Sequence, residues 1–274
     1  MVSISLIVAV YKDVEATELI LGALEKQNFQ DFEIIVAEDC QSDEMATCIQ
    51  KYNHLNLKHT SQIDNGWQKN ASLNKAIRIA TGELLVFIDG DCIPNRNFVE
   101  EYDKHKKECT VLCGRRIELG PKYSTRLRNA ELNIESIQKN YLFNSISLLM
   151  DGVRHYEEGI YFNDLLFDLK HKGKKAGILG CNFAVNRKDI EAINGFNEEY
   201  KSPSVGEDTD IEYRLRLKGC QLERIRNKSF VFHLYHKEVY DEKAFNRSMK
   251  VFTAFKKQNT FVCSKGLKKL SNDL

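Results

Sequence analysis

Residues 84–88 form an uninterrupted apolar run that ends at Asp89, Gly90 and Asp91. A short, fully apolar segment predicts a strand that is buried on both faces of a sheet. The two carboxylates would then lie at the carboxyl end of that strand, where open α/β sheets bind their ligands. Charges so close to a core are costly unless they are compensated, and a divalent metal ion would compensate them. The segment therefore indicates a metal site for phosphate chemistry.

Two other structures are conceivable for this segment. An EF-hand calcium loop is excluded, because Ile93 stands where an oxygen ligand is required and Pro94 replaces the turn glycine. An ordinary surface turn after a strand stays open if the three residues are considered alone. Polar residues that follow other predicted strands favour the metal site.

The length and charge of the chain narrow the possible functions. With 274 residues, the chain is long enough for one large domain with a substantial core. Its formal net charge of +1 at pH 7 gives no field that would attract a polyanion, so nucleic acid is not indicated as a partner. No apolar run approaches the length of a membrane span, and nothing resembles a signal peptide.

The eight cysteines are scattered along the chain and contain no CxxC pair. Several of them, such as Cys92, Cys113 and Cys181, fall in segments with core character. We interpret the cysteines as reduced thiols, which predicts a cytoplasmic protein. A zinc site is the alternative, although the close spacing typical of zinc ligands is absent.

Strand-like and helix-like segments alternate along the first part of the chain. This order predicts βαβ units, and therefore a mainly parallel sheet with right-handed crossovers. We expect strands at residues 3–10, 32–37, 55–60, 84–89 and 110–113, and helices at residues 13–27, 69–80 and 97–107. In the second part we expect helix over residues 122–150, an irregular functional loop over 151–175, strands at 178–185, 221–226 and 229–234, and helices at 187–193 and 207–218.

Two polar residues follow the first two predicted strands. Tyr11 comes directly after the first strand, and Asp39 comes after the second. Because parallel strands end at the same edge of a sheet, both side chains are expected near Asp89. Tyr11 could stack on a flat base, and Asp39 could accept hydrogen bonds from a ring N–H. A surface tyrosine and a helix-capping aspartate are the structural alternatives.

The segment from Gly206 to Asp210 opens a predicted helix over residues 211–218. Asp208 precedes the apolar Ile211 and Leu215 by helical spacings, so its side chain is expected to point inward. A helix N-terminus favours an ionised carboxylate, which suits a general base. An acidic N-cap without catalytic role is the alternative.

Two histidines fall in and after a predicted strand near the end of the chain. Period-two alternation places His233 and Tyr235 on one face of that strand and His236 on the other. A neutral imidazole of His233 could complete the coordination of a metal ion held by Asp91. A histidine that is merely hydrogen-bonded is the alternative.

Taken together, these segments resemble the family 2 glycosyltransferases, which have the GT-A fold. The resemblance is carried by residues 5–12, 32–43, 74–77 and 82–91. Residues 180–185, 194–196 and 206–210 look like a segment shared with galactosyl- and N-acetylgalactosaminyl-transferases. The resemblance implies a domain over residues 1–238, divided into a nucleotide-binding half (1–114) and an acceptor-binding half (115–238), with a basic helical tail at 239–274.

The resemblance also implies roles for individual residues. Asp208, with Glu207 beside it, would be the catalytic base. Asp91 and His233, with Asp89, would ligate the metal ion. The donor would be bound by a larger set of residues, namely Val10, Tyr11, Asp39, Asn74, Asp89, Gly90 and Asn182.

The implied activity is an inverting, metal-dependent glycosyl transfer. It would use Mn²⁺ or Mg²⁺, and UDP-Gal, UDP-GalNAc or UDP-GlcNAc as donor. The acceptor would be a glycan or a lipid-linked glycan in bacterial surface polysaccharide or lipopolysaccharide synthesis. The lysines of residues 256–269 suggest weak peripheral contact with an anionic membrane. A sugar-phosphate nucleotidyltransferase and a non-catalytic sugar-nucleotide-binding protein are the rival functions.

Overall fold

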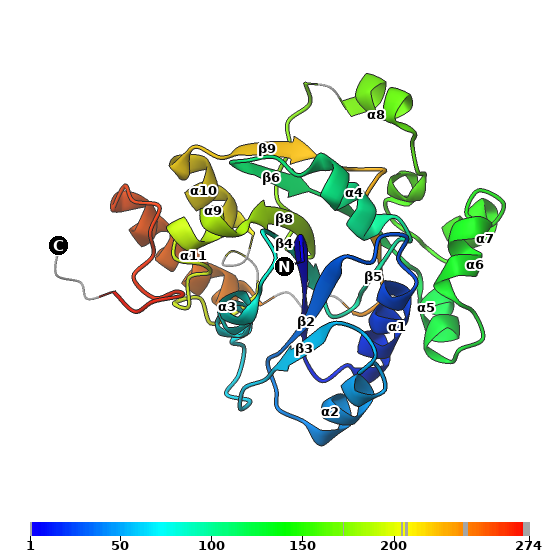
Figure 1. Cartoon of the computed structure of the whole chain (residues 1–274), viewed down its shortest axis with the longest axis horizontal. Helices are drawn as coiled ribbons and strands as arrows, with labels where there is room; N and C mark the ends of the chain where they lie inside the picture. Colours follow the sequence, from blue (N-terminus) through cyan, green and yellow to red (C-terminus); the bar gives the residue numbers. More distant parts are fainter. Residues whose placement is uncertain (1, 172, 204, 206–207, 238–240, 271–274) are drawn as a thin grey trace.

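The computed structural model describes residues 2–171, 173–203, 205, 208–237 and 241–270. A seven-stranded sheet forms its centre (Figure 1). Only β8 runs antiparallel to its neighbours, so the predicted α/β fold with a mostly parallel, mixed sheet is confirmed. The strands follow the order β3 (Leu57–Thr60), β2 (Phe32–Glu38), β1 (Ile4–Val10), β4 (Leu84–Asp89), β8 (Asn182–Asn186), β6 (Thr110–Cys113) and β9 (Gln221–Arg224).

Helices cover both faces of this sheet and produce two apolar layers. One layer contains α1 (Val14–Glu25), α2 (Asp43–Gln50) and α4 (Phe98–His105). The other contains α3 (Lys69–Ile79), α9 (Arg187–Ala192) and α10 (Thr209–Lys218). The central strands are buried on both faces, which explains their continuous apolar sequences.

A second, three-stranded sheet lies beyond the end of β4 and was not predicted as a sheet. It has the order β5 (Cys92–Pro94), β10 (Phe230–His233) and β7 (Arg115–Glu118). β5 and β7 are too short to produce a recognisable periodic pattern, and β7 follows β6 after one residue. This small sheet brings the C-terminal half of the chain to Asp91.

The segment 122–150 is mostly helical, as expected, and is divided into three short helices. These are α5 (Pro121–Arg128), α6 (Ile134–Lys139) and α7 (Ser145–Met150). Ala130 has a positive φ of 55°, and Asn133 caps α6 with its side chain, so the chain breaks between α5 and α6. Arg128 donates hydrogen bonds of 2.8 and 2.6 Å to the Asp13 carboxylate, which ties α5 to the start of α1.

The segment 151–175 is more regular than expected. It contains the 3₁₀ helix η1 (Tyr156–Gly159) and α8 (Asp164–His171), which Figure 1 shows projecting away from the main sheet. The strand expected at 178–185 begins only at Asn182.

The C-terminal tail packs on the domain and is helical only in its first part. α11 (Glu242–Lys257) buries Phe255, and residues 258–270 after it form no helix. Leu267 N donates to the carbonyl of Asn194, and Cys263 is fully buried. The prediction of one helical tail is therefore wrong beyond Lys257, because hydrogen bonds to the Asn194 turn replace helical ones.

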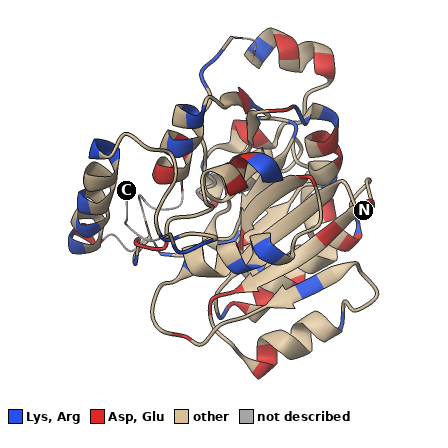
Figure 2. Cartoon of the chain, turned by 60° about the vertical axis from the view of Figure 1, so that its left-hand side comes forward, with Lys and Arg blue, Asp and Glu red and all other residues tan. Residues whose placement is uncertain are grey.

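Along the ribbon of Figure 2, positions of Lys and Arg are interspersed with positions of Asp and Glu over most elements. None of the helices among the described residues is long and apolar enough to cross a membrane.

Candidate active site

Three parallel strands end side by side where Asp89 and Asp91 emerge. β1 lies between β2 and β4, and Ala9 pairs with Asp89. At Gly90 a Cβ atom would lie 2.7 Å from the Ala9 carbonyl oxygen, so only glycine lets the turn pass this close to β1. Val10 is buried, and its carbonyl accepts from Asp39 N at 3.0 Å. The predicted common edge for these residues is confirmed.

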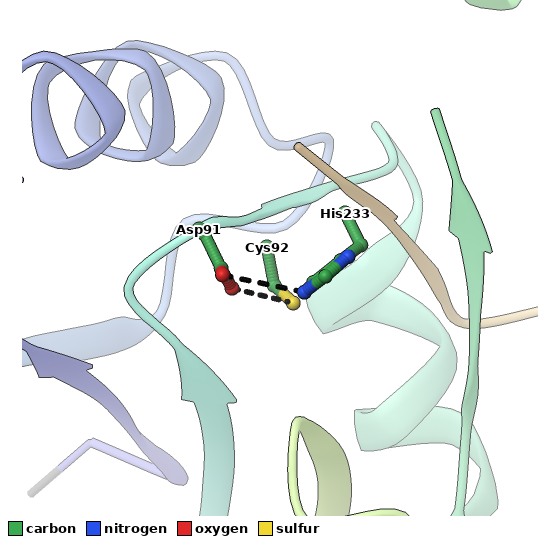
Figure 3. A group of neighbouring side chains, drawn as sticks. All are labelled: Asp91, Cys92 and His233. Atoms are coloured by element: carbon green, nitrogen blue, oxygen red, sulfur yellow. Dashed lines mark hydrogen bonds and ion pairs between the residues drawn. The ribbon is translucent and has the colours of Figure 1, made fainter. Parts of the chain in front are cut away.

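Asp91 lies among two imidazoles and a thiol. Its Oδ2 is 3.2 Å from Nε2 of His233 and 3.5 Å from Nε2 of His236, and Cys92 Sγ lies 3.4 Å from Oδ1. Figure 3 shows the side chains of Asp91, from the turn before β5, Cys92, from β5, and His233, from β10, converging. The pairing of β5 with β10, in which His233 faces Cys92, fixes this arrangement.

The ionisation of Asp91 suits a divalent cation. Burial favours a raised pKa for Asp91, but the hydrogen bond from His233 and the nearby imidazoles outweigh it and lower this pKa to about 2. Burial raises the pKa of Cys92 well above its ordinary value, so that thiol stays neutral. One ionised carboxylate with two imidazoles fits Mn²⁺ or a similar ion, whose remaining positions diphosphate oxygens could fill.

The position of His236 differs from the prediction. Period-two alternation placed it on the strand face opposite His233, but β10 ends at His233. The chain after it is irregular, and Leu234 N donates to the Asp91 carbonyl at 2.9 Å. This turn brings both imidazoles to Asp91, so alternation does not apply beyond the strand end.

Asp89 has a different environment from Asp91. Its Oδ1 lies 2.6 Å from Nζ of Lys69, at the start of α3. This ion pair compensates the Asp89 charge within the protein. Asp91 is therefore the better direct metal ligand, and Lys69 is a site residue that the sequence patterns did not reveal.

Tyr11 and Asp39 lie at the ends of β1 and β2, as predicted. The Tyr11 ring is half exposed, and its hydroxyl donates to Asp64 at 3.2 Å. Asp39 is buried and accepts from Gln62 Nε2 at 2.6 Å and from Gln68 N at 2.8 Å. Each Asp39 oxygen keeps a free lone pair for another donor. The segment 60–68 thus forms one wall beside the predicted base-binding residues.

A cavity of about 800 Å³ adjoins the cluster of Asp91, His233 and His236. Asp89, Asp91, His233 and His236 line one side of it. Its other side comes from β7, the start of α5 and the turn after α7, with Arg116, Glu118, Leu119, Pro121, Asp151, Gly152 and Arg154. Sequence reasoning missed these residues, because β7 was not recognised as a strand.

Asp208 lies at the N-terminus of α10, as its N-cap residue. Its Oδ1 accepts from the backbone N–H of Thr209, and the side chain is partly exposed. The inward-pointing carboxylate is instead that of Asp210, which is fully buried and paired with Arg214 at 2.7 Å. The expected inward orientation of Asp208 is therefore wrong, since an N-cap residue lies outside the helical repeat. Glu207 lies outside the described residues.

Asn74 and Asn182 are fully buried and fully engaged within the protein. Asn74 Nδ2 donates to the Phe196 carbonyl at 2.8 Å, and its Oδ1 accepts from Phe196 N at 2.9 Å. Asn182 Oδ1 accepts a hydrogen bond from the Tyr102 hydroxyl, and its Nδ2 donates one to the Arg115 carbonyl. These contacts occupy both amide groups within the protein, and the contact of Asn74 and Asn182 with the donor stays a prediction.

The fold and the edge cluster define a GT-A type α/β domain. The model of glycosyl transferase family 2 matches residues 5–193, and the chain belongs to this family. A second model, described as the N-terminal domain of galactosyltransferase, matches residues 166–237. The two matches confirm the resemblance, including its galactosyltransferase-like C-terminal part.

The relatives with known names include two synthases of Pasteurella multocida. The chondroitin synthase of strain Pm70 is 26% identical over 227 residues, which are 80% of this chain and 23% of that protein. The hyaluronan synthase is 27% identical over 242 residues, or 82% of this chain and 24% of that protein. The chain thus spans about a quarter of the length of these relatives.

Solved structures share the fold. Staphylococcus aureus TarS 1-349 in complex with UDP matches with a TM-score of 0.58 and 19% identity, over 92% of this chain and 64% of that one. The Pyrobaculum calidifontis mannosyltransferase PcManGT in complex with GDP-Man and Mn²⁺ matches with a TM-score of 0.58 and 15% identity, over 94% and 64% of the two chains.

Proposed function

We propose that this chain transfers a sugar from a UDP-sugar to a hydroxyl group of a glycan acceptor, with inversion at the anomeric carbon. UDP-Gal, UDP-GalNAc and UDP-GlcNAc are the proposed donors. The observation that carries the proposal is the cluster of Asp91, His233 and His236 at the carboxyl edge of β4. Family membership and the UDP complex of TarS support it.

Asp91 and His233 would hold Mn²⁺ or Mg²⁺, with His236 as a further candidate ligand. A bound cation of this kind neutralises the charge that grows on a departing nucleoside diphosphate. Asp89, which pairs with Lys69, would contact the ribose of the donor or the metal ion. Gly90 lets this loop lie against the end of β1.

The uracil base would lie between the ends of β1 and β2. The half-exposed ring of Tyr11 offers a stacking face, and the Asp39 carboxylate offers an acceptor for a ring N–H. Lys12 pairs with Asp64 at 2.7 Å and lies 4.7 Å from the Tyr11 ring centroid. These contacts would hold the stacking residue in place before the donor binds.

Asp208 would take the proton from the acceptor hydroxyl as that oxygen attacks the anomeric carbon. It lies at the N-terminus of α10, where its partly exposed side chain is open to an acceptor hydroxyl. The attack comes from the face opposite to the leaving diphosphate, so an α-linked donor would give a β-linked product.

Nucleoside diphosphate release tests this function. The chain is incubated with each of the three UDP-sugars, a panel of glycan acceptors and Mn²⁺, and UDP is measured with and without excess EDTA. Acceptor-dependent UDP release that EDTA abolishes is expected. Pyrophosphate formation from UTP and a sugar phosphate would instead indicate a nucleotidyltransferase. Donor binding without release for any acceptor would indicate a binding protein.

The acceptor proposal includes a lipid-linked glycan at an anionic membrane. α11 packs through Ala244, Ser248 and Phe255, while Lys250 and Lys257 lie outside this buried set. Partitioning onto phosphatidylglycerol vesicles should fall when residues 256–274 are deleted. Equal partitioning of the intact and shortened chains would contradict the membrane contact.

A further inference from the structure

Two cysteines and an aspartate meet at the end of the central sheet that lies opposite to the candidate active site. β4 and β6 run in the same direction, because each is antiparallel to β8. Cys109 precedes β6 and Cys220 precedes β9, whereas Asp91 follows β4. The cysteines therefore lie at the amino ends of their strands, on the far side of the sheet from Asp91.

The three potential ligands come from separate parts of the chain. β6 and β9 pair in parallel, with Thr110 opposite Gln221, so the preceding cysteines are neighbours (Figure 1). Their sulfur atoms lie 3.5 Å apart. Asp189, in the first turn of α9, brings a carboxylate oxygen within 4.8 Å of both.

The buried Asp189 carboxylate has one oxygen whose hydrogen-bonding capacity the described residues leave unused. Its side chain is 2% exposed. Oδ1 accepts from Nζ of Lys218 at 2.7 Å, but Oδ2 has no hydrogen-bond partner among the described residues. A buried carboxylate oxygen without a partner is costly, and a cation between it and the two sulfur atoms would remove that cost.

We propose that Cys109, Cys220 and Asp189 bind a structural zinc ion. In tetrahedral zinc sites with Zn–S bonds of about 2.3 Å, two thiolates lie roughly 3.8 Å apart. The observed sulfur separation needs only a small adjustment. Cys109 is partly exposed, which leaves an entry route and room for water as the fourth ligand.

Charge balance supports the same ion. Two thiolates, the Asp189 carboxylate, the Lys218 ammonium group and Zn²⁺ sum to zero, so the buried site would carry no net charge. Lys218 would hold the carboxylate in place through the oxygen that does not face the ion. The ion would join β6, β9 and α9 directly, and through Lys218 the last turn of α10.

A disulfide between the two cysteines is the competing outcome, and the surroundings disfavour it. It would leave the buried Asp189 Oδ2 without a partner, whereas a cation between this oxygen and the two sulfur atoms would satisfy it.

Cobalt binding to the full-length, fully reduced chain tests the proposal. The Cys92→Ser background removes the one thiol beside Asp91, so any thiolate-to-cobalt absorption must come from another site. Titration with Co²⁺ should produce this near-ultraviolet band, saturate it at one equivalent per chain and lose it on addition of Zn²⁺. Zn²⁺ should also raise the Tm.

Variants in the same background show which residues bind the ion. Cys109→Ser should abolish the band and the Zn²⁺-dependent rise in Tm, and Asp189→Asn should weaken Co²⁺ binding at least about tenfold. Cys48→Ser, which changes a buried cysteine of α2, is the matched control and should behave as the parent does. Cys109 is partly exposed, so serine there should be compatible with folding, which circular dichroism checks.

Three results would overturn the proposal. The first is a folded, reduced chain that shows no thiolate-to-cobalt band. The second is sub-stoichiometric binding that Cys109→Ser leaves unchanged, which would indicate an adventitious ion only. The third is a purified chain in which two fewer thiols can be alkylated than the sequence contains, and which takes up no Co²⁺ after reduction. That result would show that Cys109 and Cys220 form a disulfide.

Discussion

The Asp91 carboxylate lies 3.2 Å from Nε2 of His233, although the two residues belong to opposite halves of the chain. The pairing of β5 with β10 creates this contact. Asp91 comes from the half with the β1–β4 edge, and His233 from the half that contains α10. The contact therefore joins the proposed diphosphate site to the half that carries the proposed base.

Asp91→Asn and His233→Ala should each weaken Mn²⁺-dependent binding of UDP by about tenfold or more, because each removes a proposed metal ligand. Isothermal titration with UDP, in the presence and absence of Mn²⁺, measures the effect. His54→Ala is the matched control, since His54 is exposed and pairs with Glu25 on the surface. Equal Mn²⁺ dependence in the parent and in Asp91→Asn would contradict the metal assignment.

Asp208→Asn should lower turnover by roughly 10²–10⁴ and leave donor binding nearly unchanged, because the amide still caps α10 but cannot take a proton. Steady-state UDP release and UDP titration measure the two effects. Asp168→Asn, an exposed change on α8, serves as the control. Near-normal turnover of Asp208→Asn would exclude this residue as the base.

Gly90→Ala should destabilise the loop that carries Asp91, because the added Cβ would lie 2.7 Å from the Ala9 carbonyl oxygen. A lower Tm together with weaker UDP binding is expected. Gly22→Ala is the control in α1, where the nearest atom to the new Cβ is Tyr52 Oη at 3.6 Å. That change should stabilise the chain by up to about 1 kcal/mol. Parent-like UDP binding by Gly90→Ala would show that this close approach is unimportant for the site.

The buried pair Asp210–Arg214 should hold α10 in place behind Asp208. Both side chains are fully buried, and Arg214 also donates to the carbonyls of Ile193 and Gly195. Arg214→Met would leave the Asp210 charge buried without its partner and should cost about 3–5 kcal/mol in the free energy of unfolding. Urea denaturation measures this loss.

An exposed pair of the same spacing provides the control for Arg214→Met. Lys104 pairs with Glu100 on the surface of α4, and Lys104→Gln should cost less than about 1 kcal/mol. Comparable losses for the two substitutions would contradict the proposed role of the buried pair.

The pKa of Glu33 predicts how the free energy of unfolding depends on pH. Burial favours a raised pKa for Glu33, but hydrogen bonds from Lys58, Ser5 and Thr81 outweigh it and lower this pKa from 4.5 to about 2. Because the folded-state pKa is the lower one, the ionised group stabilises the fold above pH 4.5. This contribution should disappear as the pH falls to about 2.

Glu33→Gln should therefore cost on the order of 3 kcal/mol near pH 7, with the difference from the parent shrinking between pH 4.5 and pH 2. Urea denaturation at several pH values measures it. Glu44→Gln, at an exposed position in α2, should show no such pH dependence. A difference that stays constant with pH would show that packing, not ionisation, is responsible.

Local patterns in the sequence predicted the architecture well. The apolar runs of β1, β2 and β4, separated by amphipathic helices, identified a mostly parallel α/β sheet, and the family model confirms the resemblance that those segments carry. Burial on both faces requires continuous apolar residues, so such strands can be recognised in a single sequence. The polar residues at their ends were placed correctly at one edge for the same reason.

Patterns of this kind failed where an element is short or a contact is distant. β5 and β7 have three and four residues, too few for a periodic signal, and the turn after β10 carries His236 back to Asp91. Helical spacing also misplaced Asp208, because the helix begins one residue after it.

The sequence by itself determined the strands, their common edge and the presence of Asp89 and Asp91 there, because periodicity and strand ends are local properties. Only the tertiary structure decided which partners these groups have. It brought His236 to Asp91 beside the expected His233, Lys69 to Asp89, and Cys109 and Cys220 to Asp189. Such contacts depend on how separate elements pack, and no spacing along the chain encodes them.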